Sequence, residues 1–211
     1  MRRPAFALAA ILAALLAALA CVQPALAHHV MDGDMPATLA QGLLSGLGHP
    51  IIGLDHFAAV VAVGCIASVH AAGARLVFGY VAAMMAGVAV HLTGASLPGA
   101  ELWVAASVIA LGLVLAARRD LGVPAAFAVF AAVGLLHGYA LGESIYGAEP
   151  TPLVAYLAGL GIIQSVIALA AMNVARLIAR RMANAMPLRL IGAGIAGLGL
   201  AIFVQQVTSA V

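Results

Sequence analysis

The sequence predicts an all-α, polytopic membrane protein with six transmembrane helices after a cleavable signal peptide. Hydrophobic residues make up 65% of the 211 residues and charged residues 8%, whereas soluble domains have about 45–50% and about 25%. The mean hydropathy is +1.17, so the chain lacks the polar surface that a water-facing globule needs. A positively charged N-terminus followed by an apolar stretch predicts the signal peptide, and six further long apolar stretches predict the transmembrane helices.

The first 27 residues have the three parts of a signal peptide. Arg2 and Arg3 form a charged start, residues 5–20 are apolar, and Ala25-Leu26-Ala27 is an A-x-A cleavage site. We therefore expect residues 1–27 to be removed.

Cleavage after Ala27 would place His28 and His29 at the start of a single transmembrane domain, residues 28–211. Lipid attachment at Cys21 and an uncleaved first helix are the alternatives. The two histidines beside a free amine could capture a metal ion at the entrance, or could belong to a solvated tail.

Six hydrophobic stretches are long enough to cross a bilayer, which takes about 20 residues. Short connections that carry Gly, Pro or Arg separate them, and the third stretch is the shortest. The six predicted spans are residues 50–69, 76–95, 102–117, 124–141, 153–175 and 188–207.

Arginine sets the predicted orientation, because cytoplasmic connections carry the excess of Arg and Lys. The connections after spans one, three and five carry Arg75, Arg118, Arg119, Arg176, Arg180, Arg181 and Arg189. The alternate connections carry acids and no arginine, namely Asp32, Asp34, Glu101, Glu143 and Glu149. We expect a bacterial inner-membrane protein whose mature N-terminus and C-terminus both face the periplasm.

The composition also limits the partners. No basic patch is interleaved with aromatic residues, which excludes nucleic-acid binding. Two distant cysteines give neither a disulfide framework nor a CxxC pair. The bilayer is the expected partner, no tightly bound cofactor is expected, and association into a homo-oligomer stays open.

A short helix is expected on the outer membrane surface before the first span, within an outward segment of residues 28–48. Thr38 and Gln41 have the spacing of a capping box, and one helical face is apolar, with Leu39, Leu43, Leu44 and Leu47. Pro50 suits the first position of the first span, which would leave His49 at its cap.

Few ionisable residues fall within the spans, where each costs roughly 2.5–3.5 kcal/mol on insertion scales and indicates a functional site. They are Asp55, His56, His91 and His137, with His49 and Glu143 at span ends. The helical rise places the imidazoles about 6–9 Å below the outer ends of three spans. We therefore predict an outward-facing metal site formed by these six residues.

Neutral imidazole with carboxylate suits nickel, cobalt, zinc or copper(II) better than copper(I) or magnesium. His49 and His56 share a helical face but lie about 10 Å apart along a regular helix. Pro50 and Gly53 would relax that restriction and let His49 fold over the mouth of the site. Asp55 could be a ligand or could orient a neighbouring imidazole.

Other polar and small residues add weaker signals. Gln164 could line a path or form a plain interhelical hydrogen bond. Ser107 and Ser165 have no obvious partner and no HExxH motif occurs, so we expect no enzyme activity. Cys65 is expected to be a packing residue. Regularly spaced glycines predict close helix packing, namely Gly134, Gly138, Gly142, Gly192, Gly194, Gly197 and Gly199.

The run His49-Pro50-x-x-Gly53-x-Asp55-His56 resembles the HPxxGxDH signature of the HupE/UreJ family of nickel and cobalt permeases at every specified position. A second family motif, approximately HGxAHGxE, is similar to the segment from His137 to Glu143. That segment has Leu141 where the family often has histidine. Its acidic residue, Glu143, comes one position before the place of the acid in the family motif.

The resemblance implies a secondary transporter or permease that imports Ni²⁺, with Co²⁺ next. It also implies an indirect link to the metal supply of hydrogenase, urease or cobalamin. No nucleotide-binding motif occurs, so the membrane potential is the expected driving force, and coupling to protons stays open. A haem-binding membrane electron carrier that uses transmembrane histidines is the alternative function. Short histidine motifs in the first and fourth spans also suggest inverted repeats.

Overall fold

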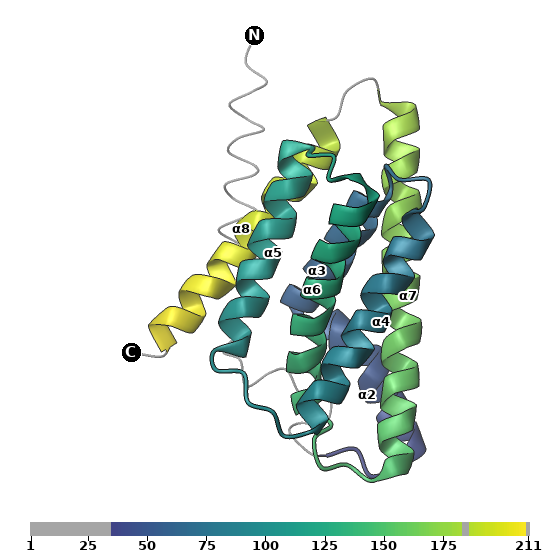
Figure 1. The fold of residues 1–211 in the computed structure, drawn as a ribbon, viewed down its shortest axis with the longest axis vertical. Helices are drawn as coiled ribbons and strands as arrows, with labels where there is room; N and C mark the ends of the chain where they lie inside the picture. Colours follow the sequence, from purple (N-terminus) through teal and green to yellow (C-terminus); the bar gives the residue numbers. More distant parts are fainter. Residues whose placement is uncertain (1–34, 183–185, 210–211) are drawn as a thin grey trace.

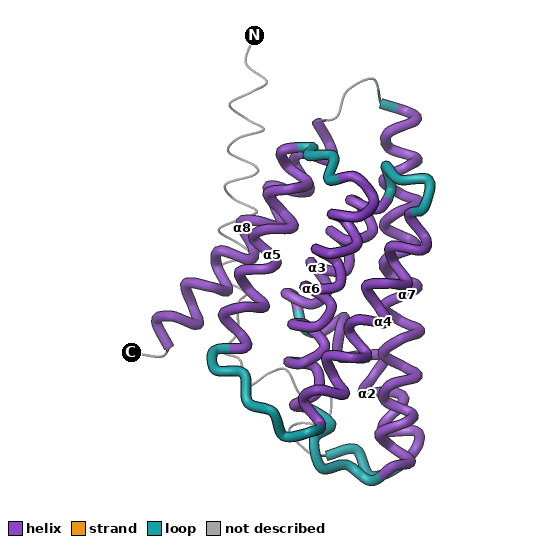
Figure 2. Tube along the Cα trace, in the orientation of Figure 1, coloured by secondary structure: helices purple, strands orange, loops and turns teal. Residues whose placement is uncertain are grey.

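The computed structural model describes residues 35–182 and 186–209, which form seven helices and no strand (Figures 1 and 2). The helices are α2 Leu39–Ile52, α3 Leu54–Ala67, α4 Gly73–Leu92, α5 Ala100–Ala117, α6 Gly122–Glu143, α7 Pro150–Arg181 and α8 Met186–Ser209. The predicted all-α class is confirmed. The predicted signal peptide, its cleavage site, His28 and His29 lie outside the described residues.

Five helices, α4 to α8, are long and apolar enough to cross a membrane. The helices α2 and α3 meet at a bend of 77° and pass the same test together. The described residues therefore hold six candidate spans if the bent pair counts as one. The six-span prediction agrees with the structure on that count.

The bend corrects the predicted start of the first span. Pro50 lies inside α2 and His49 lies in its last turn, so neither begins a span. A proline inside a helix removes a hydrogen-bond donor and crowds the carbonyl four residues earlier, and α2 ends two residues later. Gly53 is extended there, with φ −72° and ψ 100°, and its N–H donates to the His49 carbonyl oxygen at 2.9 Å.

The helix α2 packs on α7, and its position relative to a membrane surface stays a prediction. The Thr38–Gln41 capping box is present as predicted. Gly42 and Gly46 face the backbone of α7 at Pro152 and Tyr156. Small residues let two helices approach closely, so α2 lies against α7.

Glycines also pair the other helices. In α6, Gly134 and Gly138 face the backbone of α4 at Tyr80 and Met84, so α4 and α6 run parallel, as α2 and α7 do. The helices α5 and α8 pack antiparallel through glycine contacts. Divide the chain into α2–α5 and α6–α8, and count the bent pair α2–α3 as one span. The first span of the first half then packs on α7, the second helix of the other half, and α6 packs on α4 in the same way. Inverted repeats produce this exchange of contacts.

The two ends of the bundle differ in charge. All seven arginines of the described residues lie where α3, α5 and α7 end or where α4 and α8 begin, at the upper end in Figure 1. Glu101, Glu143 and Glu149 lie at the opposite end, and Asp120 lies with the arginines. We call these ends the arginine end and the acidic end. Their orientation in a membrane stays a prediction.

Gly138→Ala is expected to lower the free energy of unfolding by about 1–3 kcal/mol, the usual cost of overpacking. A Cβ at this position would overlap the Met84 carbonyl oxygen of α4, so α4 and α6 would have to separate. The thermal unfolding midpoint in detergent measures the loss. Gly194→Ala is the control, because nothing lies within 4 Å of a Cβ there. Equal midpoints for the two variants would contradict this packing.

Candidate functional site

Polar side chains are buried in an otherwise apolar core, where each costs free energy unless it is hydrogen-bonded or paired. In the described residues they are Ser45, His49, Asp55, His56, His70, Ser107, His137 and Gln164. Four of the six predicted site residues are therefore buried. His70 follows α3 at the arginine end, away from the other three histidines.

The bend at Gly53 places Asp55 and His56 in the first turn of a new helix, α3. Oδ1 of Asp55 accepts a hydrogen bond from the His56 N–H at 2.7 Å. A helix N-terminus carries a partial positive charge that stabilises a carboxylate. This location explains how an aspartate that is only 4% exposed is accommodated inside the bundle.

Three imidazoles from three helices meet near this helix end. Nδ1 of His56 lies 2.8 Å from Nδ1 of His137 in α6, and the two ring centroids are 4.9 Å apart. The His49 ring of α2 lies 6.0 Å from the His56 ring and 6.5 Å from the Tyr156 ring. We call His56 and His137 the imidazole pair.

Ser107 of α5 determines which nitrogen of His137 carries the proton. Its hydroxyl donates its single proton to the Val104 carbonyl oxygen at 2.7 Å. The 2.9 Å contact between Ser107 Oγ and His137 Nε2 therefore requires the proton on Nε2. A neutral His137 ring then has its lone pair on Nδ1, facing His56. The expectation that Ser107 has no obvious partner is wrong, because its partner lies on another helix.

The imidazole pair has nearly the spacing that a shared metal ion requires. Two nitrogens bound to one ion at about 2.0–2.1 Å each stand about 3 Å apart, and the observed distance is 2.8 Å. In the part of the chain that the structure describes, no three His, Cys, Asp or Glu side chains are grouped so that they could hold a metal ion. An ion at this pair would therefore keep water or draw in a further ligand.

His91 and Glu143 stand apart from the imidazole pair. The helix α4 ends at Leu92, three residues before the predicted end, so His91 lies in its last turn. The His91 ring is 4.6 Å from the Tyr139 ring and 5.6 Å from the Tyr146 ring. Glu143 is exposed at the end of α6. The six predicted residues thus form a buried group of four and two outer residues.

Glu101 is a carboxylate that the sequence analysis did not connect with the buried group. It is half-buried in the first turn of α5 and interacts electrostatically with Asp55 and Glu143. Of these three carboxylates, Glu143 is exposed, Glu101 is half-buried and Asp55 is buried. In the sequence, Glu101 is a single acidic residue next to a predicted span, and only its charge could have drawn attention to it.

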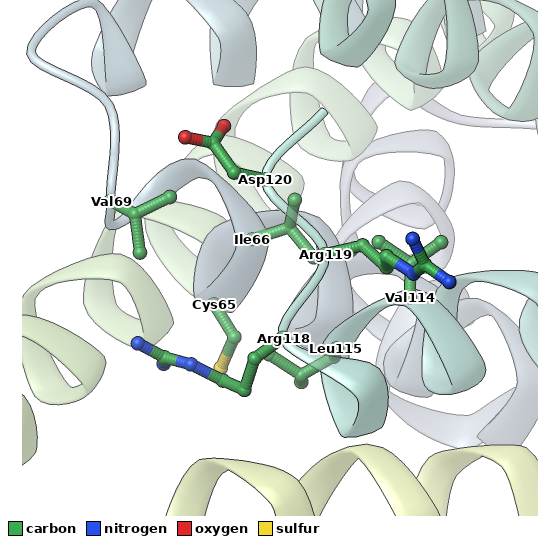
Figure 3. Close-up of a pocket in the computed structure, with 8 residues that line it drawn as sticks. All are labelled: Cys65, Ile66, Val69, Val114, Leu115, Arg118, Arg119 and Asp120. Atoms are coloured by element: carbon green, nitrogen blue, oxygen red, sulfur yellow. The ribbon is translucent and has the colours of Figure 1, made fainter. Parts of the chain in front are cut away.

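A cavity of about 220 Å³ lies at the arginine end (Figure 3). It is lined by Cys65, Ile66, Val69, Val114, Leu115, Arg118, Arg119 and Asp120. Figure 3 shows the side chains of Arg118 and Arg119 extending in different directions, so they do not converge on one ligand. Cys65 lies about 14 Å along α3 from His56. This cavity is therefore separate from the imidazole pair.

The fold and the buried group define a polytopic helical membrane protein with imidazole and carboxylate side chains buried in its interior. A sequence model of the HupE / UreJ protein family matches residues 15–202, and the chain belongs to this family. The protein HupE of Rhizobium leguminosarum bv. viciae is 36% identical over 129 residues. The match covers 60% of this chain and 64% of that protein. No solved structure matches the chain.

Membership in the family confirms the resemblance seen in the HPxxGxDH run. The family is of the transporter type, associated with nickel and cobalt, and is not an enzyme family. The structure and the family together support a membrane protein of this family. The ion, its ligands and the direction of transport are proposals.

Ser107→Ala is expected to change the tautomer of His137. The wild-type ring should be neutral with its proton on Nε2, and loss of the serine acceptor should let the proton move to Nδ1. Solid-state NMR of protein with ¹⁵N-labelled histidine distinguishes protonated from bare ring nitrogens. Ser165→Ala is the matched control, since Ser165 bonds to the Gly161 carbonyl oxygen of its own helix. A wild-type proton on Nδ1 of His137 would contradict the assignment.

Proposed function

We propose that the protein imports a divalent transition-metal cation, Ni²⁺ first and Co²⁺ next, across the bacterial inner membrane. One observation carries the proposal. Nδ1 of His137 faces Nδ1 of His56 at 2.8 Å, next to the buried Asp55, inside an apolar bundle. Imidazole nitrogen and carboxylate oxygen together suit nickel, cobalt and zinc. Family membership supports the same class of cargo.

Ion binding would use groups that are already aligned. His137 presents a bare Nδ1, and His56 presents one as soon as its own proton lies on Nε2. The Asp55 carboxylate offsets part of the divalent charge. With so few protein ligands the ion would keep some of its water, and it would bind weakly enough to leave again.

The ion would enter from the acidic end, where carboxylates raise the local concentration of cations. Glu143 is exposed, Glu101 is half-buried and Asp55 is buried. His137 lies about 9 Å along α6 from its end at Glu143, so the imidazole pair is in the half of α6 nearer the acidic end. The arginine excess favours the opposite end as the cytoplasmic one, which makes this direction import.

The membrane potential is a sufficient driving force for this direction. A charge gains about 2.3 kcal/mol per 100 mV, so a divalent ion gains about 4.6 kcal/mol. At about 1.4 kcal/mol per factor of ten, that gain supports accumulation of over a thousandfold. Uptake would then need no nucleotide hydrolysis.

The geometry disfavours the haem alternative at the imidazole pair. Axial nitrogens bound at about 2 Å on opposite faces of an iron would stand about 4 Å apart, with the macrocycle between them. His56 and His137 instead meet edge to face with their nitrogens 2.8 Å apart. No macrocycle fits between rings that are in direct contact.

His56→Ala and Asp55→Asn are each expected to lower uptake of labelled nickel and cobalt by about tenfold or more, because each removes a ligand or its charge. The assay uses proteoliposomes with equal amounts of folded protein and an inside-negative potential. His70→Ala is the matched control and should transport like wild type, since His70 is also buried but lies at the arginine end. Wild-type rates in His56→Ala, or no uptake by the wild-type protein, would refute the proposal.

A further inference from the structure

Two polar side chains in the core, Tyr80 of α4 and Gln164 of α7, have no hydrogen-bond partner among the described residues. Both residues are fully buried, at 0% exposure. The Tyr80 hydroxyl and both amide atoms of Gln164 lack partners in that part of the chain. Buried polar atoms are nearly always bonded, and an unbonded one destabilises the fold. We call these two residues the inner polar pair.

A purely structural role does not account for Gln164. The interhelical hydrogen bond that the sequence leaves open is not formed within the described residues. A leucine would fill the same core position without burying polar atoms. The amide therefore indicates a partner from outside the described residues, and water or a hydrated ion has the matching hydrogen-bonding groups.

Gln164 faces the break between α2 and α3. One turn before it, the backbone of Leu160 faces Gly46 of α2, and one turn after it, the backbone of Ala168 faces Gly64 of α3. Residues four apart share a helical face, so Gln164 faces the stretch between these two glycines. The site residues at the bend lie in the middle of that stretch.

Tyr80 reaches the same region from α4. Its carbonyl oxygen faces Gly134 of α6. Gly134 precedes His137 by three residues and therefore lies nearer the arginine end, where α6 begins. The helices α4 and α7 also contact each other. Tyr80 therefore lies on the arginine-end side of His137, and Gln164 lies level with the bend, so the two residues border the imidazole pair from two neighbouring helices.

We propose that the inner polar pair binds the divalent cation, together with the water it retains, next to the imidazole pair on the side formed by α4 and α7. This inference rests on the proposed transport. A phenol and a primary amide each donate and accept hydrogen bonds, so they suit the water of a hydrated ion. They carry no charge that would hold the ion, and conduction requires sites that an ion can leave.

Tyr80→Phe and Gln164→Leu remove the hydrogen-bonding atoms and keep nearly the same volume. Each is expected to lower the initial rate of cobalt and nickel uptake into proteoliposomes by about tenfold. Cobalt binding to the detergent-solubilised protein, followed by absorbance, should match wild type because the imidazole pair is intact. The thermal unfolding midpoint should equal or exceed that of wild type, because no hydrogen bond to another described residue is lost. Ser165→Ala, at the next position of α7, should match wild type in all three measurements.

Wild-type uptake in both variants would overturn the role of the inner polar pair and leave the proposed function intact. Loss of cobalt binding or of thermal stability in step with uptake would also overturn it, because the residues would then act through packing. Failure of the proposed function is distinguishable, since His56→Ala would then transport at the wild-type rate as well. That result would remove both proposals.

Discussion

The break at Gly53 is the constraint on which the site depends. A straight helix would carry His49 and His56 about 10 Å apart along its axis and would place no helix end inside the bundle. Because Pro50 and Gly53 interrupt it, α3 begins inside the bundle with the positive end of its dipole beside Asp55. The 77° bend also brings the His49 and His56 rings to 6.0 Å. A proline and a glycine thus convert an apolar span into a polar site.

Apart from His70 at the arginine end, most of the remaining buried polar groups are arranged around this helix end. The helix α6 supplies His137, and α5 fixes the proton of that ring through Ser107. The helices α4 and α7 supply Tyr80 and Gln164. Of the helices in the described residues, only α8 supplies none of them, and it packs mainly on α5 at the edge of the bundle (Figure 1). Polar groups destabilise an apolar core unless they are compensated, so their concentration at one place indicates function.

The features that could be predicted from the sequence are those with local causes. Hydropathy predicted the helices, the Thr38–Gln41 spacing predicted the start of α2, and the HPxxGxDH run pointed to the residues at the bend. Features that depend on contacts between distant segments were missed. Ser107 looked isolated because its partner lies on α6. The packing of α2 on α7 was missed because the glycines that form the contact have no polar signature. Glu101 was not connected with the buried group because its neighbours come from other helices.

Anomalous X-ray data at the cobalt edge, collected from crystals of the Co²⁺-loaded protein, would test the imidazole pair most directly. An ion bound as proposed gives a peak within about 2.0–2.2 Å of Nδ1 of both His56 and His137. The same peak should be absent in His56→Ala. A peak confined to His91 or Glu143, with His56 and His137 still hydrogen-bonded to each other, would contradict the central claim.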